Sequence, residues 1–321
     1  MNITVVGCGR WGSCIAWYLA GLGHRVTLYG RENSPHFRAF CENRTNGLVT
    51  LPDSVTLCSS LETALQTAQT VVLSIGAQNL REFMAQASAF PLDGKDFVLC
   101  IKGIEIESGK LLHEIMAEFV PPSCGVAVWV GPGHVQEFVK GHPNCMVLDS
   151  ADKECTHRLV DAFSGGIIRF YYGCDLIGTE IGSATKNVIG IAAGILDGLN
   201  RSSLKGALMS RSVVETARLI RKAGGNPCSA FGLAMLGDFE ATVFSPYSHN
   251  RAFGEAFARR EPYTELAEGY YTAKALYGLC RRYDTEMPIC EAVYRALYEQ
   301  KSIQTEIEGL FSRSMKEEFN F

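Results

Sequence analysis

The chain lacks the sequence features of several large classes of protein. Its 30 lysines and arginines against 34 acidic residues give a formal net charge of −4, which argues against nucleic acid as a partner and against binding to anionic lipid. Its apolar runs all fall well short of the ~18 residues of a membrane-spanning helix, and no targeting sequence or internal repeat is visible. We therefore expect a globular cytoplasmic protein with no membrane insertion.

Signatures of metal sites and of disulfide frameworks are lacking as well. None of the 12 cysteines stands in C-x-x-C spacing, and the seven histidines are scattered without an H-x-x-x-H pair. A chain of 321 residues with 47% hydrophobic composition is large enough to bury a core without disulfides. We expect no metal, and reduced cysteines that pack as small hydrophobic residues.

What the chain does have is a glycine-rich turn close to its start. An apolar, β-prone run over residues 2–6 leads into Gly7, Gly9 and Gly12, and a helical pattern follows over residues 13–22. In this spacing the first glycine permits a tight turn, the second lets the backbone approach a pyrophosphate, and the third lets the helix pack close to the sheet. The unpaired N–H groups of the helix N-terminus then bind the phosphate charge. The pattern predicts a dinucleotide site; a structural turn that merely needs glycine is the alternative.

The two halves of the chain differ in their periodicity. The first half alternates helical patterns with short β-branched runs, which cover residues 25–29, 70–75, 97–101, 126–130, 145–148 and 167–172. This alternation predicts a parallel sheet covered by helices, with the later strands as candidates for antiparallel additions. The second half has long helical patterns over residues 185–199, 204–223, 265–283 and 289–299. We expect an α/β protein with an N-terminal Rossmann-type, doubly wound sheet (residues 1–173) and an all-helical C-terminal domain for substrate and catalysis (residues 174–321).

Three further segments are candidates for chemistry. Lys102 follows an apolar strand, where ligands bind in open α/β folds, although an exposed lysine after a strand is also common. The turn at Gly131 has backbone N–H groups that can approach a ligand, and it fits a purely structural turn equally well. The polar, glycine-containing stretch over residues 224–253 is typical of an active-site wall, with a solvated surface loop as the alternative.

Lys186 is the candidate for proton transfer. The helical pattern places it near the start of the first long helix of the second domain, where the helix dipole is unfavourable for a positive charge. Such a placement suits a lysine that is poised to move a proton. A solvated lysine on a flexible stem is the plain alternative.

Several motifs in a fixed order resemble the bacterial NAD(P)-dependent sn-glycerol-3-phosphate dehydrogenase family, from residue 1 to about residue 297. The matching residues are Gly7-Cys8-Gly9-Arg10-Trp11-Gly12, Lys102-Gly103, Gly131-Pro132, Lys186-Asn187-Val188, Ile191-Ala192-Ala193-Gly194, Gly232-Leu233-Ala234, Gly237-Asp238, Ala267-Glu268-Gly269 and Glu286-Met287-Pro288-Ile289. The resemblance implies an oxidoreductase that interconverts dihydroxyacetone phosphate and sn-glycerol 3-phosphate for phospholipid synthesis, with NADP or NAD as cofactor and a homodimeric assembly.

The resemblance also implies roles for individual residues. Lys186 exchanges the proton of the carbon-2 oxygen, Lys102 contacts the substrate near the nicotinamide, and Asp238 holds a lysine or a substrate hydroxyl in place. The implied cofactor contacts are Gly7, Gly9, Arg10, Trp11, Gly12, Arg31, Lys102 and Glu268. The implied substrate contacts are Lys102, Gly131, Lys186, Asp238, Ser248, His249, Asn250 and Arg251.

The chain departs from the family pattern at the substrate phosphate. Members usually carry Ser-Arg-Asn where this chain has Ser248-His249-Asn250, and the family arginine clamps the phosphate. Histidine is shorter and only partly charged at neutral pH, so it cannot replace a guanidinium contact directly. Arg251 and Lys205 are the candidates to compensate. We expect either a weaker affinity for glycerol 3-phosphate or a shifted substrate. Gly133 stands where serine is usual.

Two other questions stay open in the sequence. Arg31 follows the second predicted strand in place of the acidic residue that selects NAD, so we expect use of both cofactors with a mild preference for NADPH. The competing functions are a related reductase of another small 2-keto or 2-hydroxy compound, and a catalytically silent nucleotide-binding sensor.

Overall fold

A computed structural model describes residues 1–315, 317 and 318 of the chain. The chain forms two compact units, which are described separately below. The first comprises residues 1–101 and 112–176, and the second comprises residues 102–111 and the described residues from 177 onward. The end of the predicted second domain, residues 316 and 319–321, lies outside the described residues.

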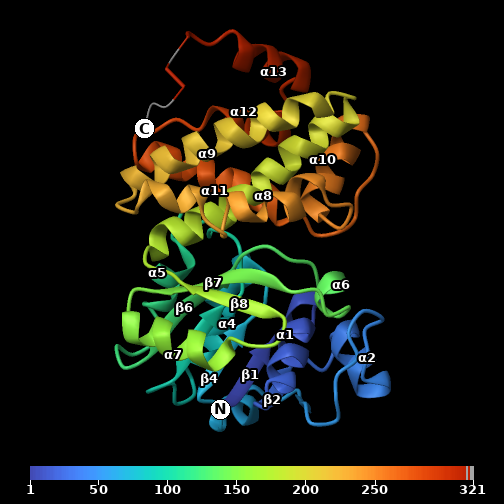
Figure 1. The fold of residues 1–321 in the computed structure, drawn as a ribbon, viewed down its shortest axis with the longest axis vertical. Helices are drawn as coiled ribbons and strands as arrows, with labels where there is room; N and C mark the ends of the chain where they lie inside the picture. The colour runs from blue at the N-terminus through green and yellow to red at the C-terminus, as the bar shows by residue number, and fades with distance from the viewer. Residues whose placement is uncertain (316, 319–321) are drawn as a thin grey trace. The chain divides into compact units, whose positions relative to one another are not determined.

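The first unit is built on an eight-stranded sheet (Figure 1). Its spatial order is β3-β2-β1-β4-β5-β6-β7-β8. The strands from β3 to β6 are all parallel, β7 runs antiparallel to β6, and β8 pairs in parallel with β7. The strands are β1 (Asn2–Val6), β2 (Arg25–Tyr29), β3 (Thr56–Cys58), β4 (Thr70–Leu73), β5 (Asp96–Leu99), β6 (Gly125–Val130), β7 (Asn144–Ser150) and β8 (Ile168–Tyr172). This arrangement confirms the Rossmann-type sheet and the antiparallel addition.

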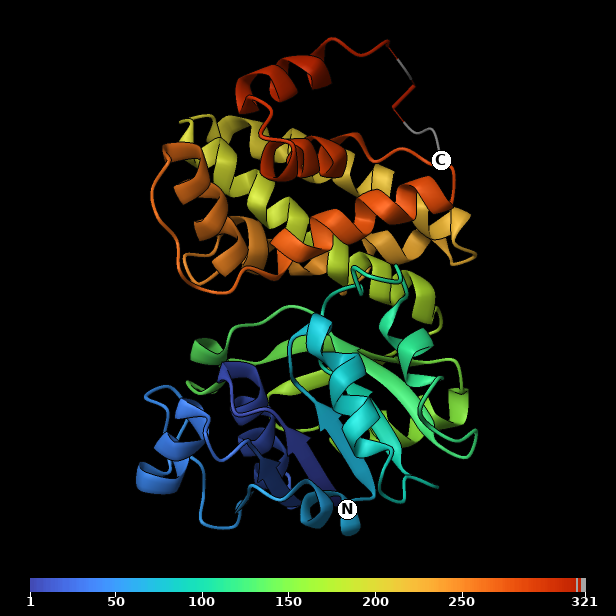
Figure 2. The same cartoon turned by 180° about the vertical axis from the view of Figure 1, so that it is seen from behind.

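Helices cover both faces of this sheet, as the two opposite views show (Figures 1 and 2). Successive strand residues point to opposite faces. In β5, Val98 packs in the core that contains residues of helices 10–21 and 153–163, while Phe97 and Leu99 pack in the core that contains residues of helices 80–87 and 112–116. The helices of this unit are α1 (Arg10–Gly21), α2 (Pro35–Asn43), α3 (Leu61–Gln66), η1 (Ala77–Asn79), α4 (Leu80–Ala87), α5 (Leu112–Met116), α6 (Val135–Phe138) and α7 (Lys153–Phe163). Apolar residues on both faces of the strands are the reason for the near-continuous hydrophobic runs in the sequence.

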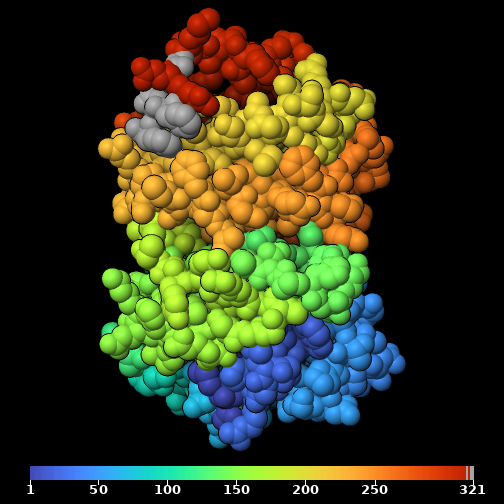
Figure 3. Space-filling view, in the orientation of Figure 1, coloured from blue at the N-terminus to red at the C-terminus, as the bar shows by residue number. Residues whose placement is uncertain are grey.

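The second unit is made of helices around a core of its own. Its elements are α8 (Leu176–Gly198), η2 (Ser202–Leu204), α9 (Lys205–Lys222), η3 (Pro227–Phe231), η4 (Leu236–Asp238), η5 (Glu240–Phe244), α10 (His249–Arg259), α11 (Glu268–Arg282), α12 (Pro288–Tyr298) and α13 (Ile303–Phe311). In the space-filling view, α9 and the segment that follows it form much of the surface that this unit turns to the viewer (Figure 3). The predicted helical character of this half is confirmed.

Glycines on one face of α8 let other segments pack against this helix closely. Gly190, Gly194 and Gly198 recur every four residues and therefore share a face. A Cβ atom at Gly194 would lie 1.9 Å from the backbone oxygen of Arg251, and one at Gly190 would lie 2.9 Å from the Thr242 side chain. The glycine face therefore allows η5 and α10 to pack directly against the helix that carries Lys186.

The sequence missed some elements of both units. The three-residue strand β3 is too short to show a periodic pattern. The stretch over residues 224–253, which we expected to be an active-site wall or a surface loop, contains the three short helical turns η3 to η5 and the start of α10. All 12 cysteines lie in the described part of the chain, and none of them is in a disulfide. Among the residues that the structure describes, no helix combines the length and the apolar character that a bilayer crossing requires.

Candidate active site

The glycine turn of the first unit lies between β1 and α1, as the spacing predicts. A Cβ atom at Gly7 would lie 2.2 Å from the backbone oxygen of Ser74, and Gly7 has a positive φ of 111°. A Cβ atom at Gly12 would lie 2.0 Å from the backbone oxygen of Gly7. Both positions therefore need glycine for the fold itself.

Gly9 differs from its two neighbours in the motif. A Cβ atom there would have no protein atom within 4 Å among the described residues, so the space beside Gly9 is open. Gly9 is also the N-cap of α1, and having no side chain it leaves the first N–H groups of the helix uncapped by its own residue. An open, uncapped helix N-terminus after a parallel strand fits the pyrophosphate of a dinucleotide.

The other cofactor candidates of the first unit lie at the carboxyl ends of the strands or next to the turn. Arg10 and Arg31 are exposed, the latter two residues after β2. Trp11 is half-buried, with its ring 6.4 Å from the Trp129 ring in an edge-to-face arrangement. The structure therefore places Trp11 partly in the core, and leaves the two arginine side chains accessible to a ligand.

Gly131 follows β6 at the same edge of the sheet and has a φ of 137°. A Cβ atom at this position would lie 2.9 Å from the Met146 Cα atom. At Gly133, with a φ of 141°, it would lie 2.4 Å from the Phe138 ring. The Phe138 ring therefore occupies the space that a side chain at residue 133 would need in this chain.

The three predicted catalytic residues come together in the second unit. Both ammonium groups contact one oxygen of Asp238: Lys102 Nζ lies 2.8 Å and Lys186 Nζ lies 2.7 Å from Asp238 Oδ2. Asp238 is 1% exposed and Lys186 is 6% exposed, whereas the Lys102 side chain is 24% exposed. Lys186 Nζ also donates to Thr242 Oγ1 at 2.8 Å. One buried carboxylate thus holds two positive charges side by side.

This environment brings the pKa of Lys186 close to neutral pH. Burial lowers the pKa of Lys186 to about 8, the Asp238 carboxylate opposes the shift, and the Lys102 ammonium adds to it. A group with a pKa near the working pH is suited to general acid and base catalysis. Lys186 can therefore both donate and accept a proton.

The predicted helix context of Lys186 is wrong. The helix α8 begins at Leu176, so Lys186 lies in its interior and not near its start. The apolar pattern weakens around Gly178, Thr179 and Glu180, and this weakening hid the first turns of the helix from the sequence analysis. The dipole argument therefore fails, and burial beside a second lysine is the physical cause of the lowered pKa.

The four consecutive substrate candidates form the N-terminus of α10. Ser248 is the N-cap, and its Oγ atom accepts a hydrogen bond from the Arg251 N–H at 3.3 Å. His249 is half-buried, and its Nδ1 atom lies 2.9 Å from the hydroxyl oxygen of Tyr263. The residue that replaces the family arginine is thus held by a tyrosine that the sequence did not single out.

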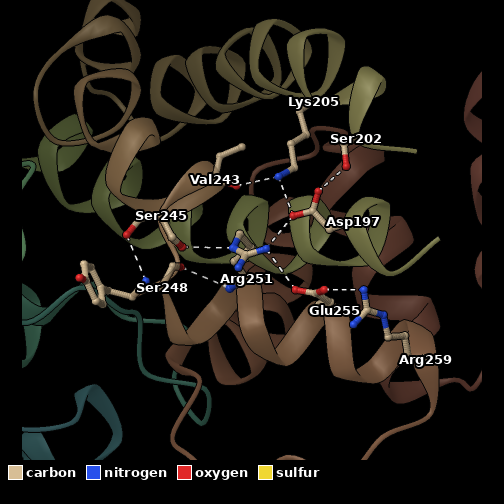
Figure 4. A network of polar contacts seen from close by, with 10 residues as sticks. Asp197, Ser202, Lys205, Val243, Ser245, Ser248, Arg251, Glu255 and Arg259 are labelled. Atoms are coloured by element: carbon tan, nitrogen blue, oxygen red, sulfur yellow. Dashed lines mark hydrogen bonds and ion pairs between the residues drawn. The ribbon is translucent and has the colours of Figure 1, made fainter. Parts of the chain in front are cut away.

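Arg251 and Lys205, the two candidates to replace that arginine, are both engaged by Asp197 (Figure 4). Asp197 Oδ2 lies 2.6 Å from Lys205 Nζ and 2.8 Å from Arg251 Nη1. Arg251 also contacts Glu255 at 3.1 Å, and Lys205 donates to the Val243 backbone oxygen at 3.0 Å. Burial alone would raise the pKa of Asp197, and hydrogen bonds from Lys205, Ser202 and Arg251 lower it below its usual value. These contacts favour a structural role for both cations.

The sequence analysis did not assign roles to Thr242 and Asn187. Asn187 Nδ2 donates to the Lys102 backbone oxygen at 3.0 Å, and Asn187 Oδ1 accepts from Asn250 Nδ2 at 3.1 Å. Asn250 Oδ1 accepts from the Gly269 N–H at 2.8 Å. Asn187 stands directly after Lys186 in a matching motif, and this position could have indicated a role for it in the site. Thr242 lies in none of the matching motifs. Glu268, the remaining cofactor candidate, is the first residue of α11 in the second unit.

A glycine cradle on a Rossmann-type sheet, and a buried lysine with a pKa near 8 in a helical unit, define a nicotinamide-dependent oxidoreductase. The N-terminal and C-terminal models of NAD-dependent glycerol-3-phosphate dehydrogenase match residues 2–156 and 175–308. The chain therefore belongs to the NAD-dependent glycerol-3-phosphate dehydrogenase family, whose cofactor is NAD or NADP.

Individual relatives agree with the family models. The chain is 37% identical to a glycerol-3-phosphate dehydrogenase [NAD(P)+] of Chlorobium limicola over 99% of both chains. It is 34% identical to the enzyme of the same name from an Exiguobacterium species, over 99% of this chain and 97% of the relative. Its structure is similar to the crystal structure of glycerol-3-phosphate dehydrogenase from Coxiella burnetii, with a TM-score of 0.91, 27% identity, and 97% and 99% of the two chains covered. These matches extend across both units.

Proposed function

We propose that this protein interconverts dihydroxyacetone phosphate and sn-glycerol 3-phosphate with NADP or NAD as the redox partner. The observation that carries the proposal is the pair of ammonium groups on the buried Asp238 oxygen. Reduction of a ketone needs a positive charge and a proton at the carbonyl oxygen, because that oxygen becomes an alkoxide. The pair supplies both at one place.

The nicotinamide, when bound, supplies the hydride that reduces the ketone carbon. Lys186 then donates its Nζ proton to the oxygen on that carbon, which gives the alcohol and leaves a neutral amine. Lys102 stabilises the negative charge on the same oxygen, and the Asp238 side chain holds both amines in place. In the direction of oxidation, neutral Lys186 accepts the proton from the hydroxyl group.

His249 is the proposed ligand of the substrate phosphate. Two observations support this assignment: the hydrogen bond between His249 and Tyr263 fixes the imidazole, and Arg251 and Lys205 are already engaged by Asp197. When the tyrosine hydroxyl donates to Nδ1, the opposite ring nitrogen carries a proton that it can donate to a phosphate oxygen.

Further substrate contacts remain predictions. Ser248 and Gly131 are proposed substrate contacts. The Ser248 hydroxyl oxygen accepts a hydrogen bond from the Arg251 N–H, and the Ser248 backbone N–H donates to the Ser245 backbone oxygen at 3.3 Å, so Ser248 is proposed to contact the substrate through the hydrogen of its hydroxyl. The side-chain oxygen of Asn250 accepts one hydrogen bond within the protein and its amide nitrogen donates one, so the second N–H of the amide is its proposed substrate contact.

Cofactor preference and cellular role also belong to this proposal. Exposed Arg31 suits a 2′-phosphate, so we propose comparable use of both cofactors with a mild preference for NADPH. Arg10, Trp11 and Glu268 are proposed cofactor contacts, together with the glycine turn. We further propose a cytoplasmic homodimer that supplies glycerol 3-phosphate for phospholipid synthesis, with residues 1–173 binding the cofactor and residues 174–321 binding the substrate.

The test is steady-state oxidation of NADPH and of NADH with dihydroxyacetone phosphate and with unphosphorylated dihydroxyacetone. We expect turnover with the phosphorylated ketone and an efficiency at least tenfold lower without the phosphate. Variants His249→Arg and His249→Ala separate phosphate binding from chemistry: the first is expected to lower KM for the phosphorylated ketone, and the second to raise it. Turnover that is indifferent to the phosphate would assign the site to another small 2-keto compound. NADPH binding without turnover of any ketone would indicate a nucleotide sensor.

A further inference from the structure

Asn187 connects α8 to two other segments of the second unit. Its side-chain N–H donates to the backbone oxygen of Lys102 at 3.0 Å, and its side-chain oxygen accepts from Asn250 at 3.1 Å. Asn187 is only 6% exposed, so these hydrogen bonds are made away from competing water. The amide therefore reaches the Lys102 segment on one side and α10 on the other.

Lys102 is consequently held at two points. Its backbone carbonyl is bound by Asn187, and its ammonium group is bound by Asp238 at 2.8 Å. The segment 102–111 that carries it also inserts Ile104, which is 0% exposed, into the core of the second unit. A lysine on a flexible stem is thereby confined to a position beside Lys186.

The start of α11 fixes the orientation of this amide pair. Asn250 Oδ1 accepts from the Gly269 N–H at 2.8 Å. A Cβ atom at Gly269 would lie 2.5 Å from the Asn187 backbone oxygen and 2.9 Å from Asn250 Oδ1. Because Asn250 uses its oxygen toward Gly269, it must turn its amide nitrogen to Asn187, which in turn directs the Asn187 nitrogen to Lys102.

We propose that Asn187 is a positioning residue. By binding the Lys102 carbonyl, it keeps the Lys102 ammonium on Asp238 and beside Lys186. Asn250 orients the Asn187 side chain. The Lys102 charge disfavours protonation of Lys186, since two like charges share one carboxylate. The groups that face Lys186 are Asp238, Lys102 and the Thr242 hydroxyl. Moving Lys102 away therefore strengthens the binding of a proton by Lys186.

The test is a titration of Lys186 by carbon NMR of protein labelled at the lysine ε-carbon, with the resonance assigned by Lys186→Arg. Asn187→Ala is compared with the wild type, with Lys102→Met and with the double variant. Asn187→Ala alters no charge, so a change in the Lys186 titration reflects a change in the position of the Lys102 ammonium. We expect the apparent pKa of Lys186 to rise by roughly half a unit or more in Asn187→Ala, and the double variant to show no further rise over Lys102→Met.

Asn250→Ala serves as a second variant that acts one hydrogen bond further away. It is expected to shift the Lys186 titration in the same direction by a smaller amount. Thermal unfolding of each variant checks that it is folded under the titration conditions.

Two results would overturn the proposal: an unchanged titration in folded Asn187→Ala, or shifts that add up fully in the double variant. This inference rests on Lys186 as the proton donor of the proposed function, yet the titration needs no turnover. A wild type that fails to reduce dihydroxyacetone phosphate would therefore refute the proposed function. The titration of Lys186 would still test the role of Asn187.

Discussion

The glycine turn of the first unit and the lysine centre of the second unit are constructed in opposite ways. The turn lies within six consecutive residues and presents backbone atoms around the open space beside Gly9. The centre draws Lys102, Lys186 and Asp238 from distant parts of the chain, buries the last two and leaves Lys102 half-buried. The first depends on space that side chains leave free, and the second depends on burial, which lowers the pKa of Lys186 to about 8.

The largest expected effect is at the lysine centre. Lys186→Met removes the proposed proton donor and should lower kcat for ketone reduction by about 10²–10⁴-fold, the usual contribution of a general acid. Binding of NADPH, measured by calorimetry, should change little. Lys222→Met, at an exposed position near the end of α9, is the matched control and should keep full turnover. An undiminished kcat in Lys186→Met would show that the lysine centre does not supply the proton.

The second largest effect concerns a partly buried ion cluster of the same unit, formed by Asp197, Lys205 and Arg251 (Figure 4). Asp197→Ala leaves Lys205 and Arg251 without their shared carboxylate, which should cost roughly 3–5 kcal/mol of unfolding free energy. Arg259→Ala, which removes the ion pair between the 45% exposed Arg259 side chain and Glu255, should cost under about 1 kcal/mol. Denaturant unfolding measures both. Equal losses in the two variants would show that burial is not what distinguishes these pairs.

Two substitutions within the turn separate folding from binding. Gly12→Ala forces a Cβ atom against the Gly7 backbone and should destabilise the protein by roughly 1–3 kcal/mol. Gly9→Ala meets no described protein atom and has an ordinary φ of −69°, so stability should change by less than about 1 kcal/mol. Its dissociation constant for NADPH should nevertheless rise about tenfold or more, because the added methyl group occupies the space of the pyrophosphate. An unchanged NADPH affinity in Gly9→Ala would show that the glycine turn does not bind the cofactor.

The contrast between these two regions also decides what the sequence could predict. Gly7, Gly9 and Gly12 act through local backbone geometry, so their spacing alone predicted the turn. The interior position of Lys186 and its contact with Thr242 arise from packing between α8 and η5, which no local pattern contains. The resemblance to a family supplied Lys102 and Asp238. It could not show that Asp197 engages Arg251, because Asp197 lies outside the matching motifs and the contact arises from the packing of α8 against α10.

The smallest expected effect is the pH dependence of stability at Glu215. This carboxyl group accepts N–H bonds from Ile289 and Cys290, and burial raises its pKa to about 7. Ionising a group with a raised folded-state pKa costs stability, so the protein should lose about 1 kcal/mol between pH 6 and pH 8 through this residue. Glu215→Gln should flatten that slope in denaturant unfolding at the two pH values. A slope that Glu215→Gln leaves unaltered would assign the pH dependence to other groups.

The pH dependence of kcat in both directions tests the central claim most directly. Reduction of dihydroxyacetone phosphate needs protonated Lys186, so its kcat should fall as pH rises through about 8. Oxidation of glycerol 3-phosphate needs neutral Lys186, so its kcat should rise through the same pH. Opposite limbs centred near pH 8 would support a proton-transferring Lys186, whereas profiles that stay flat between pH 7 and about 9.5 would contradict it.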